Sequence, residues 1–127
     1  MVKKIMVFGT FDRLHPGHEF VITEALRRGA VTVIVARSKN VQKIKGRLPR
    51  ETDDERIAAI RDKFPEAVVL AGDQTDFLAP VRTLRPDLIL LGYDQRLPPN
   101  VTQQDLAPAS IERLAAHEPE RYKSSLR

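Results

Sequence analysis

Four short apolar runs, separated by helix-like segments, constrain the fold of this chain more than any other feature. The runs cover Ile5–Phe8, Val31–Val35, Ala67–Leu70 and Leu88–Leu91. Strands that are apolar at nearly every position are buried on both faces, which is typical of a parallel sheet covered by helices. With right-handed crossovers, the chain is predicted to form an α/β fold: a Rossmann-like, doubly wound parallel sheet of four to five strands with helices on both faces.

Helix signals fill the segments between these runs. Apolar residues recur at helical spacing over Gly17–Arg28. Thr52–Glu55 has the sequence of a capping box, which predicts the start of another helix, and Asp76–Leu84 is expected to be helical as well. The basic stretch Arg37–Glu51 lacks an apolar period and is predicted to be a loop. Gln103–His117 is predicted to be helical, divided by a proline.

Composition limits the class of protein. With 127 residues, 42% of them hydrophobic, the chain 1–127 is predicted to form a single domain with a core of its own. Cysteine is absent, which excludes disulfides, thiolate metal sites and a cysteine nucleophile, and a cytoplasmic location is expected. No apolar run approaches the length that spans a bilayer, so no membrane partner is expected.

The net charge of +4 is modest and favours anionic partners in general. The phosphates of a nucleotide fit this charge as well as those of a nucleic acid do. Aromatic residues are few and tryptophan is absent, so the side chains that stack on nucleic-acid bases are largely missing. Nucleic acid is therefore not a predicted partner, although charge alone does not dismiss a basic nucleic-acid-binding domain.

The segment most informative about chemistry follows the first apolar run. It reads Gly-Thr-Phe-Asp-Arg-Leu-His-Pro-Gly-His from Gly9 to His18 and leads into the first predicted helix. Ligands of open parallel sheets gather at this end of the strands. Gly9 allows a sharp turn and Thr10 adds a hydroxyl, while Gly17 lets another group come close to the histidines. A helix start adds free amides and a positive dipole end, which favour phosphate.

His15 and His18 are three residues apart at this helix start, so their rings can project to one side. Two imidazoles that face a triphosphate can donate hydrogen bonds to its oxygens and stabilise the charge of a transition state. A metal site is the other interpretation of a His-x-x-His pair, but Asp12 is the only further ligand nearby. Strand, glycine turn and helix together favour phosphate.

These motifs resemble the signature of the cytidylyltransferase-like nucleotidyltransferases, through Gly9–Asp12 followed by His15–His18. That superfamily includes glycerol-3-phosphate cytidylyltransferase, pantetheine-phosphate adenylyltransferase and archaeal-type FAD synthase. The resemblance runs in order and spacing from residue 3 to about residue 95, with a short further match over Tyr122–Ser125. It implies transfer of a nucleoside monophosphate from a nucleoside triphosphate to a phosphorylated acceptor, with release of pyrophosphate.

The resemblance also implies roles for single residues. His15, His18 and Lys45 would be catalytic, with Lys45 reaching the triphosphate from a mobile loop. Further positions would bind the nucleotide: Gly9, Thr10, Phe11 and Gly17 at the phosphates, Gly92, Tyr93 and Asp94 near base and ribose, and Arg121, Ser124 and Ser125 at a last helix start. Asp12 and Arg37 would contact the acceptor.

Three segments resemble the archaeal-type FAD synthases, in which AMP passes from ATP to FMN: Val33–Arg37, Lys43–Arg47 and Gly92–Gln95. Ser38 stands where that branch usually carries an acidic residue. CTP with glycerol 3-phosphate or a similar polyol phosphate is the alternative pair of substrates, and a nucleotide-binding module without turnover is a further hypothesis. The resemblance implies Mg²⁺ that arrives with the triphosphate, no dedicated protein metal site, and a homodimer as the candidate assembly.

Overall fold

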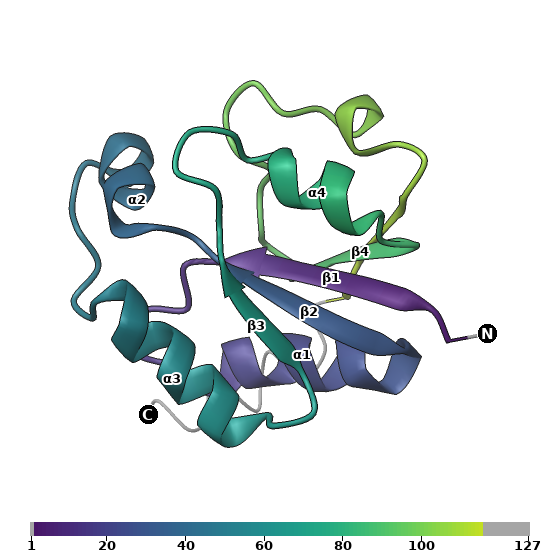
Figure 1. Cartoon of the computed structure of the whole chain (residues 1–127), viewed down its shortest axis with the longest axis horizontal. Coiled ribbons are helices and arrows are strands. Elements are labelled where there is room, and N and C mark those ends of the chain that lie inside the picture. The colour runs from purple at the N-terminus through teal and green to yellow at the C-terminus, as the bar shows by residue number, and fades with distance from the viewer. Residues whose placement is uncertain (1, 116–127) are drawn as a thin grey trace.

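A computed structural model describes residues 2–115 of the chain. Five strands alternate with helices along most of this length, as Figure 1 shows. In chain order the elements are β1 (Lys4–Gly9), α1 (Pro16–Arg28), β2 (Ala30–Val35), α2 (Ser38–Lys45), α3 (Asp53–Lys63), β3 (Val68–Ala71), α4 (Ala79–Leu84), β4 (Leu88–Leu91), the 3₁₀ helix η1 (Gln104–Leu106) and β5 (Ser110–Arg113). The four predicted strands and the helices α1, α3 and α4 are confirmed.

All strand pairs in the sheet are parallel, and the strand order is β3-β2-β1-β4-β5. The chain therefore starts in the middle, proceeds to one edge, and crosses back over β1 to build the other half. This is the predicted doubly wound topology. The strand order reverses at β1, so ligands are expected beside the carboxyl end of β1.

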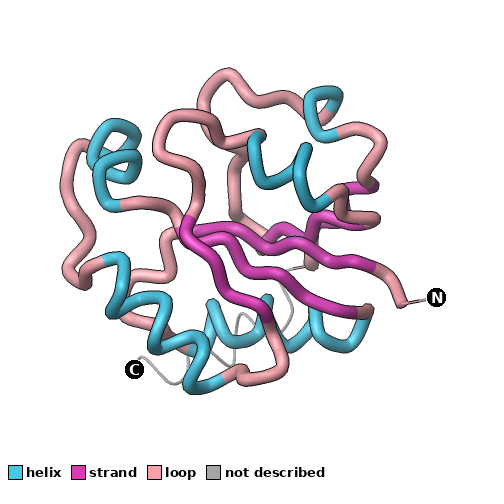
Figure 2. Tube along the Cα trace, in the orientation of Figure 1, coloured by secondary structure: helices cyan, strands magenta, loops and turns pink. Residues whose placement is uncertain are grey.

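Helices cover both faces of the sheet, which completes the predicted layers (Figures 1 and 2). On one face α1 and α3 pack against side chains such as Val7, Val33 and Leu90. On the other face α4 contributes Val81 to a smaller cluster with Met6 and Ile89. Because successive strand residues point to opposite faces, strands buried on both sides are apolar throughout.

The basic stretch that was predicted to be a loop contains a helix, so that prediction was wrong. Helix α2 presents a single buried residue, Val41, to the rest of the protein. Its two apolar residues, Val41 and the exposed Ile44, are three positions apart, but the surrounding residues are so polar and basic that this short helical pattern was not recognised. The helix ends at Gly46, which adopts a left-handed conformation (φ 79°) that glycine tolerates best.

The segment before the end of the described chain is a strand, where a helix was predicted. β5 pairs with β4 through partners such as Ile89 and Ile111. Its side chains are half-buried or exposed, since it lies at the sheet edge. A four-residue edge strand with one strongly apolar residue carries little alternation, so its sequence did not distinguish it from a helix.

Helix α4 begins three residues later than its predicted start, Asp76. The carboxylate of Asp73 accepts the backbone N–H groups of Thr75 and Asp76, and Asp76 accepts that of Leu78. These local side-chain bonds stabilise turns that compete with the helix. Within residues 2–115, no helix has both the length and the apolar character required to cross a membrane.

Candidate active site

The turn that joins β1 to α1 is organised by its two histidines. His15 is the N-cap of α1, and its Nδ1 accepts the backbone N–H of Gly17 at 3.1 Å. The Nδ1 of His18 accepts the backbone N–H of His15 at 3.4 Å, so the two residues form a reciprocal capping box. The sequence therefore uses histidines where serine and glutamate usually cap a helix, and the same bonds fix both rings.

The two imidazole rings stack, with centroids 3.6 Å apart and planes inclined by 25°. The predicted proximity of the histidines is thus confirmed. Since both Nδ1 atoms accept hydrogen bonds, each ring carries its N–H on Nε2. The pair therefore offers two N–H donors, which suits the oxygens of a phosphate group.

The pKa of His18 is lowered to about 4, mainly by burial and also by the neighbouring His15 and Lys45, against an opposite effect of Asp12. Near pH 7 the His18 ring is consequently neutral. It can donate its Nε2–H to an anion without having to lose or gain a proton.

Small residues make room for this arrangement. A Cβ atom at Gly17 would lie 3.0 Å from Cε1 of His15, so a side chain there would displace the ring. Phe11 supports His18 from the protein interior, with ring centroids 5.4 Å apart in an edge-to-face contact. The Phe11 ring is buried in the core and lies against Gly9, so Phe11 offers a phosphate its backbone and not its side chain.

Lys45 reaches the same turn from the last residue of α2. Its Nζ donates to Oγ1 of Thr10 at 3.3 Å, although the two residues are 35 positions apart in the chain. The charge of Lys45 also contributes to the lowered pKa of His18. The structure thus brings together Lys45, Thr10 and the histidine pair.

Asp12 ties the turn to the segment that follows α2. Its two carboxylate oxygens accept the backbone N–H groups of Arg50 at 2.9 Å and Glu51 at 3.0 Å. Glu51 in turn accepts the backbone N–H of Arg13 at 2.7 Å. The hydrogen bond from Arg50 is the main cause that lowers the pKa of Asp12. Asp12 therefore holds the segment after α2 against the histidine turn, and a direct contact between Asp12 and the acceptor stays a prediction.

The loop after β4 is held by two residues to which sequence reasoning gave no role. The side chain of Gln95 accepts the Gly92 N–H at 3.1 Å and donates to the Phe8 carbonyl at 2.7 Å. Arg113, in β5, donates to the Gly92 carbonyl at 3.0 Å. Gly92 is buried, whereas the side chains of Tyr93 and Asp94 are exposed. Tyr93 and Asp94 therefore stand accessible beside the carboxyl end of β4.

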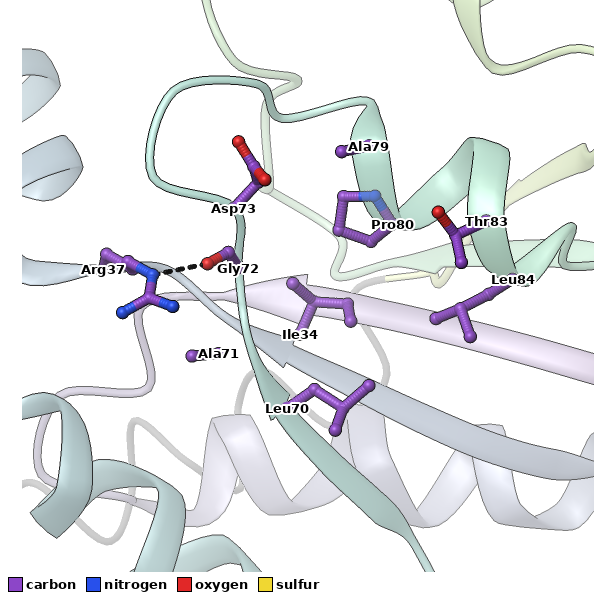
Figure 3. Close-up of a pocket in the computed structure, with 10 residues that line it drawn as sticks. All are labelled: Ile34, Arg37, Leu70, Ala71, Gly72, Asp73, Ala79, Pro80, Thr83 and Leu84. Atoms are coloured by element: carbon purple, nitrogen blue, oxygen red, sulfur yellow. Dashed lines mark hydrogen bonds between the residues drawn. The ribbon is translucent and has the colours of Figure 1, made fainter.

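Arg37 lies in a separate groove on the α4 side of the sheet, shown in Figure 3. Its Nε donates to the carbonyl of Gly72 at 2.6 Å. The groove has a volume of about 300 Å³, and its walls come from β2, β3 and α4: Ile34, Arg37, Leu70, Ala71, Gly72, Asp73, Ala79, Pro80, Thr83 and Leu84. None of the residues of the histidine turn lines it, so a contact between Arg37 and the acceptor stays a prediction.

Two further predictions concern a protein metal site and the phosphate site near the C-terminus. Within residues 2–115, no group of three or more histidine, cysteine, aspartate or glutamate side chains is placed to hold a metal ion. Arg121, Ser124 and Ser125, predicted to bind phosphate, lie outside the described residues.

Comparison with known proteins agrees with this geometry. Residues 6–121 match the family model described as cytidylyltransferase-like. The FAD synthase of Methanosphaerula palustris is 38% identical over 112 residues, which cover 87% of this chain and 71% of that protein. The FAD synthase of Methanocorpusculum labreanum is 39% identical over 112 residues, with 87% and 78% covered.

A solved structure also matches the fold. The lipopolysaccharide core biosynthesis protein from Thermoplasma volcanium superimposes with a TM-score of 0.80 and 28% identity, and the match covers 91% of this chain and 98% of that one. Sequence, topology and the histidine turn thus agree. The chain belongs to the cytidylyltransferase-like family of nucleotidyltransferases.

Proposed function

We propose that this chain is an FMN adenylyltransferase, which transfers AMP from ATP to FMN and releases pyrophosphate. The observation that carries the proposal is the similarity to archaeal FAD synthases, 35–39% identical over 87–90% of the chain in three of them. The grouping of the two histidines with Thr10 and Lys45 supports the same reaction class.

In the proposed reaction, an oxygen of the FMN phosphate attacks the α-phosphorus of ATP. The new P–O bond forms as the bond from the α-phosphorus to the bridging oxygen breaks, and pyrophosphate leaves with that electron pair. The attacking phosphate is already ionised near pH 7, so no general base is required. The work of the protein is then to position the reactants and to stabilise negative charge.

We assign that stabilisation to three side chains. The Nε2–H groups of His15 and His18 would donate to oxygens of the reacting phosphate, and the Lys45 ammonium would neutralise charge on the triphosphate. A neutral histidine such as His18 suits this role because it donates without proton transfer. The low pKa of His18 keeps it in that form at neutral pH.

Mg²⁺ would arrive bound to the triphosphate, where it neutralises charge on the phosphate oxygens. The carboxylates at the turn, Asp12 and Glu51, accept backbone N–H groups of the protein, and within residues 2–115 no group of three or more such side chains is placed to hold a metal ion. We infer that phosphate and water would hold the ion. A homodimer and a cytoplasmic location remain predictions.

Substrates are tested by pyrophosphate release from ATP or CTP, each with FMN, glycerol 3-phosphate or phosphopantetheine. We expect pyrophosphate release only in the combination of ATP with FMN. Release with CTP and glycerol 3-phosphate would replace the substrate pair but keep the reaction class. Nucleotide binding without release in any combination would favour a module that does not turn over.

Calorimetry with ATP and CTP at the same Mg²⁺ concentration provides an independent test of the base. The small residues Ala36 and Gly92 at strand ends are compatible with the larger adenine. We expect ATP to bind and CTP to bind more weakly. Clear CTP binding with none for ATP would overturn the choice of ATP.

A further inference from the structure

Among the described residues, Arg56 is the charged side chain that the fold buries completely, with 0% of its surface exposed. It lies in the first turns of α3, behind the histidine turn, and no role proposed above uses it. A buried charge is expensive to desolvate, and apolar residues of similar size often stabilise a protein as well or better. The position therefore calls for an explanation beyond stability.

The guanidinium of Arg56 joins two strand ends. Its Nη1 donates to the Thr10 carbonyl at 2.8 Å and to the Ala36 carbonyl at 2.7 Å. Thr10 follows β1 and Ala36 follows β2, so a single nitrogen atom spans the carboxyl ends of neighbouring strands. A planar, branched donor can make such contacts, whereas the single ammonium of lysine cannot reproduce them all.

The other terminal nitrogen reaches the start of α2. Nη2 donates to Oγ of Ser38 at 3.2 Å and to the Asp53 carboxylate at 2.6 Å. Asp53 also accepts the backbone N–H of Ser38 at 2.9 Å. Arg56 thus contacts two parts of the candidate site. It bonds to Thr10 directly, and it is linked to Lys45 through helix α2, which begins at Ser38.

The bond to the Thr10 carbonyl has an electronic consequence too. A carbonyl that accepts a charged donor polarises its peptide group, which strengthens the N–H at the other side of that peptide as a donor. That N–H belongs to Phe11, and no acceptor within residues 2–115 bonds to it.

We propose that Arg56 is a positioning residue for nucleotidyl transfer. It sets the separation between the Thr10 turn and the start of α2, so that Lys45 and the histidine pair act on one triphosphate. The inference rests on the proposed function for its reaction, but its contacts are independent of which acceptor is used.

Arg61 provides a matched control on the same helix. Its Nη2 donates to the carbonyl of Val69 at 2.8 Å, which is again a bond from an α3 arginine to a strand carbonyl. Val69 belongs to β3 at the sheet edge and has no contact with the histidine turn among the bonds above. Arg61 is exposed whereas Arg56 is buried, so the two variants can differ in stability, and the role of Arg56 is judged from kcat and ATP binding of folded protein.

The test compares Arg56→Lys with Arg61→Lys. Unfolding by urea measures stability, calorimetry measures ATP binding, and steady-state kinetics give kcat and the KM for FMN. For Arg56→Lys we expect kcat to fall at least about tenfold and ATP to bind about tenfold more weakly, since small displacements of catalytic groups have such effects. The KM for FMN should stay within about twofold. Arg61→Lys should lose similar or less stability and keep both values.

Unchanged kcat and ATP binding in a folded Arg56→Lys protein would overturn the proposal, as would equal losses in both variants. If Arg56→Lys does not fold, Ser38→Ala removes one Nη2 contact from a half-buried position and should lower kcat in the same direction; an unchanged kcat then overturns it. Should the wild-type protein bind ATP but make no FAD, the acceptor assignment fails, and ATP binding by the two variants still decides the role of Arg56. Failure of the wild-type protein to bind any nucleoside triphosphate would overturn both the proposed function and the role of Arg56.

Discussion

His18 occupies a position where its protonation state matters as much as its location. Its ring stacks on His15 at 3.6 Å, and two adjacent imidazolium ions would repel each other at that distance. Burial and the nearby Lys45 keep the pKa of His18 at about 4. At neutral pH the residue is therefore an uncharged donor with its proton on Nε2.

Replacement of His18 by alanine should separate this role from folding. We expect His18→Ala to lower kcat by roughly two to three orders of magnitude, as the loss of a transition-state donor does. Far-ultraviolet circular dichroism and urea unfolding should show an intact fold. Glu19→Ala, one residue further in the same helical turn, is the control and should stay near the wild-type rate. A normal rate in folded His18→Ala would remove His18 from the mechanism.

The same histidine predicts a pH dependence of stability. Its pKa in the folded protein, about 4, lies below the ordinary value of 6.5, so the unfolded chain binds more protons between these two pH values. The free energy of unfolding should consequently be fully favourable above about pH 6.5 and should decrease as the pH falls toward about 4.

Urea unfolding of the wild-type protein and of His18→Gln across this range measures the effect. Glutamine can still accept the cap hydrogen bond but does not titrate, so the variant should lose less stability on acidification. The carboxylates titrate in both proteins and cancel in the comparison. Parallel stability curves for the two proteins would contradict the assigned pKa shift.

Residues that act through their own chemistry could be predicted from the sequence, and residues that act through backbone contacts could not. His15 and His18 were found because their spacing at a helix start is distinctive. Arg56 and Arg113 donate to main-chain carbonyls of Thr10 and Gly92, which every residue type provides. Such contacts leave no pattern in the sequence and appear only once the chain is folded.

At the level of elements, the strongly buried strands were predicted and the two failures concern weakly buried elements, although β3 and α4 were predicted despite similar exposure. β1, β2 and β4 are buried along nearly their whole length, and their apolar runs mark them clearly. Helix α2 buries one residue in a mostly polar segment and β5 is a half-exposed edge, so the sequence marks neither clearly. The site depends on α2 all the same, because its last residue is Lys45.

The helix α2 also offers a clean test of Lys45. Lys45→Ala should weaken triphosphate binding and turnover much more than it changes the KM for the acceptor, since the ammonium faces Thr10 and the histidines. Lys43→Ala removes an exposed charge from the same turn of helix and serves as the control. Calorimetry with ATP and steady-state kinetics measure both. Equal losses for nucleotide and acceptor, or matching effects of the two variants, would indicate that Lys45 acts only as surface charge.

For the whole molecule, the strand order follows from general rules once the strands are known. Right-handed crossovers and a strand that starts in the middle give the order β3-β2-β1-β4, with the site at the reversal. β5 extends that half of the sheet and places Arg113 beside Gly92, which the sequence did not predict. The topology thus explains why residues near positions 10, 45, 56 and 92 surround one sheet end.

In the proposed reaction, the α-phosphate of ATP is transferred to FMN together with its adenosine. Incubation of the purified protein with FMN, Mg²⁺ and ATP labelled with ³²P at either the α- or the γ-position tests it directly. We expect the α-label in FAD and the γ-label in pyrophosphate, with both products formed in equal amounts. Label from the γ-position in the flavin product, or no labelled flavin while pyrophosphate is released with another acceptor, would contradict it.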